Sequence, residues 1–269
     1  MKKVALFMVL GLCLPFAAAF AGVNSLSDTV KEEAPDNRKL IKVGTSERPP
    51  LFISHSTKDV TNGVLEAMNA VQNDFWFSVR DIPVKRRSHS VKGGMVDIVM
   101  WDNPAWEWQI PLDTSWPLLQ AKDVFIALKD KAGGKGYFDS YTDKTFSLVS
   151  GYTYKFLGPE KKSPINPEVI FVKSEEISIK MLLANRVDIA VTSDVTLKWF
   201  LEKNPQVKPR ILISDRPEVQ YERMFLVPKE SPITASEINQ ILLMAGKQGL
   251  LESNYKRFGL DAPDYTRFQ

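Results

Sequence analysis

The sequence predicts an α/β protein with two lobes, each built on a largely parallel sheet. Short apolar segments that are typical of buried strands alternate with segments whose apolar residues recur at helical spacing. Such alternation favours parallel strands with helices packed on the faces of the sheet. A glycine-rich stretch at 131–136 separates one series of this kind from a second one. We therefore expect a lobe on each side of that stretch.

The first series begins with a strand that stops at Pro49-Pro50, because proline cannot donate to a sheet. Val64, Leu65 and Met68 then give one apolar helical face. In order, the expected elements are a strand at 40–44, a helix at 64–71, a strand at 75–79, a helix at 84–91, and strands at 96–101 and 123–128. The order up to 101 predicts a parallel sheet.

The second series has the same alternation. Strands are expected at 145–149, 170–172 and 187–191, a strand-to-helix turn at 150–153, and helices after Ser174 and over 195–201. Ser174 is predicted to cap its helix, with acidic residues in the first turn where the helix dipole favours them. A late strand is expected at 224–227, followed by a helix that opens with the capping box Thr234 to Glu237 and a last helical piece that ends at Gly259.

The N-terminus reads as a secretory signal peptide over residues 1–21. Lys2 and Lys3 precede an apolar run at 4–16, and Ala19-Phe20-Ala21 has the small-x-small pattern of a cleavage site. The run is shorter than the roughly 20 residues of a membrane-spanning helix. Residues 22–38 are polar, without periodicity, and predict a flexible tether. These features predict export to the periplasm.

Composition excludes several classes of function. The only cysteine, Cys13, lies in the leader, so the exported chain would have no disulfide and no thiol nucleophile. Two histidines are too few for a histidine-rich metal site. Loss of Lys2 and Lys3 reduces the net charge from +3 to about +1, which gives no global field for nucleic acid. No catalytic or cofactor-binding motif appears, so we expect no cofactor.

Several short motifs resemble those of the family 3 extracellular solute-binding proteins, the amino-acid-binding components of ABC transporters. Pro83-Val84-Lys85-Arg86 ahead of Gly94-Met95-Val96-Asp97 is similar to the family's arginine-bearing helix before a G-x-x-D strand. Gly151-Tyr152-Thr153-Tyr154 is similar to a G-Y-S-Y turn, and Leu183 to Asp188 to an L-x-x-G-R-V-D segment. The ending, Gly246 to Gly259, is similar to the family's terminal helix and F-G close.

This resemblance implies a two-lobed periplasmic binding protein-like (type II) fold, with two chain crossings between the lobes. Residues 39–130 and 225–269 would form lobe 1, and residues 131–224 lobe 2. A ligand would bind in the interlobe cleft, at the carboxyl ends of the strands. The lobes would close over it about a hinge, in Venus-flytrap fashion.

The chain also departs from the family pattern. The segment from Trp101 to Trp108 has no arginine, although the amino-acid binders carry Thr-x-x-Arg there to fork onto an α-carboxylate. The family acid that holds an α-ammonium would fall at Ser193, with Asp194 one position beyond. The ligand therefore stays open between an amino-acid-like molecule and a cationic one.

Trp101 and Asp102 end a predicted buried strand and are expected to face the cleft. Indoles beside a carboxylate suit a cationic or flat ligand. The nearby Trp106, Trp108 and Trp116 are interpreted as packing residues.

The other candidates are less specific. Arg86 either forks onto a ligand carboxylate or pairs with an acid such as Asp81, whereas Arg87 is expected to be solvated. Tyr152 and Thr153 stand at an expected helix start, where free amides attract anions. Ser193 and Asp194 follow a strand of the second lobe and are expected at the cleft, although Asp194 could instead cap the next helix. Phe52 could stack on the ligand or pack beneath it.

The best functional hypothesis is a periplasmic binding protein, not an enzyme, that captures a small polar molecule. Its partner would be an inner-membrane ABC permease or a membrane sensor, and it would act as a monomer without nucleic acid. The alternative is a periplasmic dehydratase of the same fold, which needs a carboxylate in the cleft as general acid or base. Asp102, Glu107 or Asp194 are the acids the sequence offers for that role.

Overall fold

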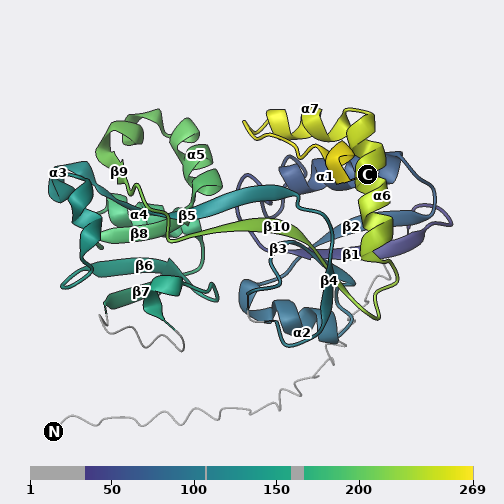
Figure 1. Ribbon diagram of the computed structural model, residues 1–269, viewed down its shortest axis with the longest axis horizontal. Coiled ribbons are helices and arrows are strands. Elements are labelled where there is room, and N and C mark those ends of the chain that lie inside the picture. The colour runs from purple at the N-terminus through teal and green to yellow at the C-terminus, as the bar shows by residue number, and fades with distance from the viewer. Residues whose placement is uncertain (1–33, 107, 159–166, 269) are drawn as a thin grey trace, which may run out of the picture. The chain divides into compact units, whose positions relative to one another are not determined.

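The computed structural model describes residues 34–106, 108–158 and 167–268 (Figure 1). The predicted leader lies outside these ranges. The elements, with short 3-10 helices written η, are β1 (Lys39–Thr45), α1 (Val60–Ala70), β2 (Phe75–Asp81), η1 (Val84–Arg86), α2 (Arg87–Lys92), β3 (Ile98–Asp102), β4 (Leu112–Thr114), β5 (Leu119–Leu128), α3 (Lys129–Ala132), η2 (Lys135–Asp139), β6 (Thr145–Val149), η3 (Lys155–Leu157), β7 (Glu168–Val172), α4 (Glu175–Leu183), β8 (Ile189–Ser193), α5 (Asp194–Lys203), η5 (Pro205–Arg210), β9 (Ile211–Ile213), β10 (Val219–Pro228), α6 (Ala235–Lys247), α7 (Leu250–Lys256) and η6 (Tyr265–Phe268).

The strands join in the order β2-β1-β3-β10-β5-β8-β6-β7, with β4 on β10 and β9 on β5. The outer strands pair in parallel, β1 with β2 and β3, and β6 with β7 and β8. The long strands β5 and β10 are antiparallel to each other and to their other neighbours. They run side by side from one set of strands to the other (Figure 1). The predicted α/β class is confirmed.

Separate hydrophobic cores lie under the two sets of strands. The larger core joins β1, β3 and β10 to α1, α6 and α7, with Ile41, Met68 and Phe225 fully buried. Two further cores lie around β8 and β6. One is mainly aliphatic and lies under α4 and α5, and the other is rich in aromatic rings around Phe146. Each set of strands thus has its own packing, and the polar residues near the start of β5 and β10 lie between them.

Local sequence signals set several helix starts. The Ser174 hydroxyl accepts from the Ile177 amide at the start of α4, as predicted. The capping box between Thr234 and Glu237 is also confirmed. No described helix is long and apolar enough to cross a membrane.

Several elements differ from the sequence-based prediction. The turn at 150–153 does not open a helix, since only the three-residue η3 follows it. Both β5 and β10 begin several residues earlier than expected, because neither first half is an apolar run. The first half of β5 alternates buried and exposed side chains, and that of β10 is only partly buried up to Glu222. The three-residue strands β4 and β9 were missed, since they are too short to show periodicity.

Candidate functional site

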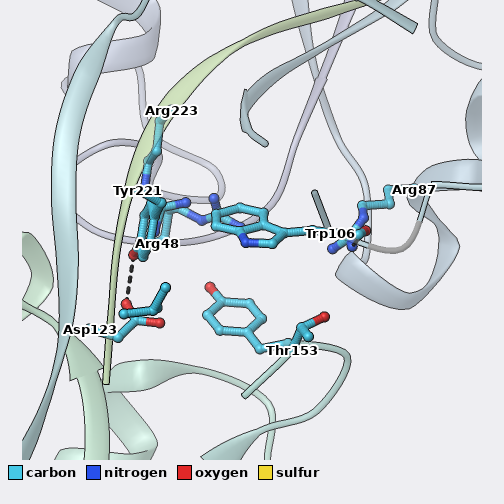
Figure 2. Close-up of a pocket in the computed structure, with 9 residues that line it drawn as sticks. Arg48, Arg87, Trp106, Asp123, Thr153, Tyr221 and Arg223 are labelled. Atoms are coloured by element: carbon cyan, nitrogen blue, oxygen red, sulfur yellow. Dashed lines mark hydrogen bonds between the residues drawn. The ribbon is translucent and has the colours of Figure 1, made fainter. Parts of the chain in front are cut away.

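A small cavity lies where segments far apart in the sequence meet, close to the start of β5 and β10 (Figure 2). Its volume is about 20 Å³, room for about one water molecule, so the walls must part for a larger solute. The lining residues come from three loops, which follow β1, β3 and β6, and from the elements α2, β5 and β10. They are Arg48, Arg87, Trp106, Asp123, Tyr152, Thr153, Val219, Tyr221 and Arg223.

Two buried arginines dominate this cavity. Arg48 and Arg223 are 6% and 1% exposed, and both donate an Nη1–H to the Trp101 carbonyl oxygen, at 2.7 and 3.0 Å. The Nε atom of each is buried without a hydrogen-bond partner. Over the described part of the chain, neither guanidinium has a carboxylate oxygen within 4.0 Å. Buried cations are usually paired, so this arrangement points to an anion-binding role.

The backbone of Trp101 holds the two arginines together. Trp101 adopts φ 64°, a conformation that bulky residues rarely occupy and that tends to occur at functional sites. Its indole is fully buried, donates to the Thr61 hydroxyl at 2.7 Å and meets the Tyr255 ring edge-on. The side chain therefore anchors in the core and does not face the cavity, contrary to the sequence-based expectation. What Trp101 offers the site is its carbonyl.

Asp102 neutralises the third arginine from behind the cavity wall. Its Oδ2 lies 3.6 Å from Nε of Arg87, and its Oδ1 accepts from the Trp108 indole at 3.2 Å. Arg87 also donates to the Trp106 carbonyl and stacks over the Trp108 ring. The prediction that Arg87 is solvated was wrong, because the loop after β3 folds back over it. The neighbouring Arg86 is the exposed one.

Aromatic rings enclose the two unpaired guanidinium groups. The Arg223 guanidinium carbon lies 5.3 Å from the Trp106 ring centre and 4.8 Å from that of Tyr221, and these two rings meet edge-on. Arg48 lies 5.6 Å from the Tyr152 ring centre. Figure 2 shows Trp106 lying between Arg87 and Arg223. Such cation–π contacts hold the cations without neutralising their charge.

Glu175, the first residue of α4, is a buried acid just behind the cavity. Its Oε2 accepts from the Ser193 amide, the Ser193 hydroxyl and the Thr192 hydroxyl at 2.7 to 3.0 Å. Burial alone would raise the pKa of Glu175, but Arg223, the Ser193 donors and Arg48 outweigh it and lower the pKa. Glu175 therefore stays ionised and ties β8 to α4.

Asp123, on β5, is the carboxyl group on the cavity wall. Its Oδ1 accepts from the Tyr221 hydroxyl at 2.6 Å (Figure 2). Burial and the nearby charge of Glu175 raise the pKa of Asp123 to about 7, although Tyr221 and Arg223 act in the opposite direction. Asp123 is thus poised to gain or lose a proton near neutral pH.

This raised pKa makes a prediction for stability. Asp123 ionises near pH 3.8 when unfolded and near 7 when folded, so it costs stability increasingly as the pH rises through that range. Asp123→Asn keeps an acceptor for Tyr221 and removes the cost. We expect the melting temperature of the variant to exceed that of the wild type at pH 8, and the difference to vanish near pH 4. A difference that stays constant in thermal melts across this range would contradict the assignment.

The structure brings few of the predicted site residues to the cavity. Tyr152 and Thr153 line it, and the Tyr152 hydroxyl donates to Glu175 at 3.3 Å. Ser193 lies behind, where it binds Glu175 and caps α5. The helix-start argument for Tyr152 does not hold, since η3 is too short to offer an anion site.

The remaining candidates lie outside the cavity. Asp194 accepts from the Lys122 amide at the start of α5, on another side of β5. Phe52 is buried, and its backbone pairs with Arg48 in an isolated β-bridge, so it fixes the loop that carries the arginine. Among the described residues, no cluster of three His, Cys, Asp or Glu side chains could hold a metal ion.

Sequence reasoning missed the residues that matter most here. Arg48, Asp123 and Arg223 were not singled out, and Trp106 was interpreted as packing. One signal was present: Asp123 begins the apolar run 123–128, and Arg223 directly precedes the apolar run 224–227. A charged residue at the end of a buried strand is a candidate for a buried polar site.

Comparison with known proteins gives a likeness in structure only. No family model and no curated protein matches the sequence. Among solved structures, the GluR0 ligand-binding core from Nostoc punctiforme in complex with L-glutamate is 18% identical, covers 81% of this chain and 99% of its own, and has a TM-score of 0.67. An ABC uptake transporter substrate-binding protein from Streptococcus pneumoniae with bound histidine is 14% identical, covers 83% and 94%, and has a TM-score of 0.70.

The chain has the two-lobed periplasmic binding protein fold. That fold is the one predicted from the sequence motifs, and the similar structures belong to the class of amino-acid-binding proteins that those motifs resemble. A third structure of this fold is the ancestral amino acid-binding protein AncCDT-1, a precursor of cyclohexadienyl dehydratase, at 16% identity, 81% and 95% coverage and a TM-score of 0.66.

Proposed function

We propose that this chain is a periplasmic solute-binding protein that captures a small polar molecule between its lobes. The observation that carries the proposal is the pair of buried guanidinium groups of Arg48 and Arg223, which face a cavity without a carboxylate partner among the described residues. A protein that only needed stability would gain little from two buried, unneutralised cations. A ligand that accepts the remaining hydrogen bonds of these guanidinium groups would account for their burial.

The fold offers a way to admit that ligand. One predicted lobe comprises residues 39–130 with 225–269, and the other comprises residues 131–224. The strands β5 and β10 connect the outer strands β1 to β3 with the outer strands β6 to β8. In our proposal these strands bend as a hinge, so that the small cavity opens to admit solute and closes over it. The loop with Arg48 and the loop with Tyr152 would separate on opening.

Similar structures support a transport role. They include an ABC uptake transporter substrate-binding protein with bound histidine, an ancestral arginine-binding protein bound to arginine, and the GluR0 ligand-binding core in complex with L-glutamate. We propose a corresponding partner for this chain, an inner-membrane ABC permease or a membrane sensor. Export to the periplasm, which the predicted leader implies, belongs to the same proposal.

One observation favours the alternative of a dehydratase. Asp123 lies on the cavity wall with a pKa of about 7, which suits a general acid or base. Of the acids named from the sequence, Asp102 is committed to Arg87, Asp194 lies elsewhere, and Glu107 is outside the described residues. An enzyme would consume its ligand, whereas a binding protein would return it unchanged.

Thermal melting with a ligand panel tests the proposed function. The purified protein is melted with amino acids, polyamines, quaternary amines, small carboxylates and short peptides. We expect at least one class to raise the melting temperature, because a ligand that binds only the folded state stabilises it. NMR of the recovered ligand should show it unchanged. A panel in which no class raises the melting temperature would contradict solute capture, and a converted ligand would favour the enzyme.

A further inference from the structure

We propose that the ligand is a carboxylate that carries no ammonium group, bound between the guanidinium groups of Arg48 and Arg223. This inference rests on the proposed function and names the chemical class of its solute. The carboxylate would accept from guanidinium N–H groups of both arginines, and the buried Nε atoms, which have no partner among the described residues, would become available to it when the walls part. Planar carboxylates suit such donors, since guanidinium groups bind them in a fork.

The charges around the cavity favour an anion over a zwitterion. Arg87 is already neutralised by Asp102, so it adds no free positive charge. Glu175 is ionised, but four donors from Ser193, Thr192 and Tyr152 occupy its oxygens and it does not line the cavity. Within the described chain, the cavity is therefore faced by two cations without a carboxylate partner, Arg48 and Arg223. The ionised carboxylate behind them, that of Glu175, is already occupied by its four donors.

Asp123 is the one described acid on the cavity wall that could bind an ammonium group. Its Oδ1 is occupied by the Tyr221 hydroxyl, and burial favours its neutral form. The charged or titratable groups that face it from the surrounding elements are Glu175, Tyr221, Arg223, Glu218, Tyr152 and Tyr154. With a neutral Asp123, the cavity has a net charge of about +1, which one carboxylate balances.

The body of the ligand would lie against the apolar parts of the wall. Trp106 and Tyr152 contribute ring faces and edges, and Val219 contributes an aliphatic side chain. These groups cannot replace water around an ammonium group by hydrogen bonding. They suit an uncharged, apolar or flat substituent.

A matched ligand series tests the inference. The probes are 3-phenylpropionate, L-phenylalanine and phenethylamine, together with the smaller pair propionate and L-alanine, each titrated calorimetrically against the purified protein. In each pair the carboxylate and the amino acid differ by a single ammonium group. We expect a carboxylate to bind roughly tenfold or more tightly than its matched amino acid, because an unpaired buried ammonium group costs that much. Phenethylamine should not bind.

The sign of the pH dependence of affinity distinguishes binding of a carboxylate from binding of a zwitterion. A bound anion disfavours the charge on Asp123, so binding takes up a proton and affinity falls by up to roughly tenfold per pH unit as the pH rises above about 7. A zwitterion that needs ionised Asp123 would bind more tightly as the pH rises. Asp123→Asn should raise carboxylate affinity at pH 8.5 to its value at pH 6 and remove the dependence. Loss of binding in this variant would overturn the inference.

Failure of the inference differs from failure of the proposed function. Amino acids or amines that bind while their matched carboxylates do not would overturn the carboxylate assignment and leave solute capture intact. Carboxylate binding that strengthens with pH would also overturn it. Arg210→Met removes an exposed arginine in η5, away from the cavity. It serves as a control for the loss of a positive charge and should bind the carboxylate like the wild type.

Discussion

Replacing Arg223 by methionine is expected to weaken binding of the solute by roughly 10- to 100-fold. The variant keeps the unbranched apolar stem of the side chain but removes the guanidinium group, which lies against the Trp106 and Tyr221 rings and has an unpartnered Nε. Hydrogen bonds to charged groups contribute about 1.5–3 kcal/mol each, which is the origin of that range. Titration of the solute that the panel identifies measures the change.

The ligand-free protein is the necessary comparison for this variant. Arg223 also helps to keep Glu175 ionised, so its loss can alter folding as well as binding. A thermal melt without ligand reports that part, and Arg223→Lys restores the charge without the fork. We expect lysine to recover only part of the affinity. If Arg223→Met folds and binds the solute as tightly as the wild type, the cavity is not the binding site.

Truncation of Glu175 is expected to have the largest effect on stability. In Glu175→Ala, the Ser193 amide and hydroxyl and the Thr192 hydroxyl lose their common acceptor while they stay buried. Unsatisfied buried donors cost about 1–3 kcal/mol each, so we expect a loss of about 3–5 kcal/mol in the free energy of unfolding. Denaturant unfolding at pH 7 measures it.

A neighbouring residue supplies the control. Glu176 belongs to the same helical turn, but its ion pair with Lys180 is exposed, so Glu176→Ala should change stability by less than about 0.5 kcal/mol. Glu175→Gln keeps one acceptor oxygen and should fall between the two. Equal stability of Glu175→Ala and Glu176→Ala would show that the buried carboxylate does not tie β8 to α4.

Glu175 and Asp123 should affect the pH dependence of wild-type stability in opposite directions. The pKa of Glu175 is lower in the folded state, so its contribution is present above its ordinary pKa of 4.5 and is lost as the pH falls through the folded value. Acid therefore weakens the tie between β8 and α4. At neutral pH the tie is complete.

By itself, the sequence determined the fold class and the positions at which several helices begin. The strand predicted at 145–149 forms β6 with those bounds, and the predicted caps Ser174 and Thr234 begin α4 and α6. These features depend on local periodicity and on neighbouring backbone amides. They can be predicted because the interacting groups are close in the chain.

The tertiary structure alone decided the site. Arg48 and Arg223 are 175 positions apart in the printed numbering, yet they share the Trp101 carbonyl, and only the folded chain brings that oxygen to them. Trp101 and Asp102 were predicted to face the ligand, but the φ of 64° at Trp101 turns its indole into the core. Whether a charged side chain is paired or free depends on neighbours distant in sequence, and local pattern carries no record of them.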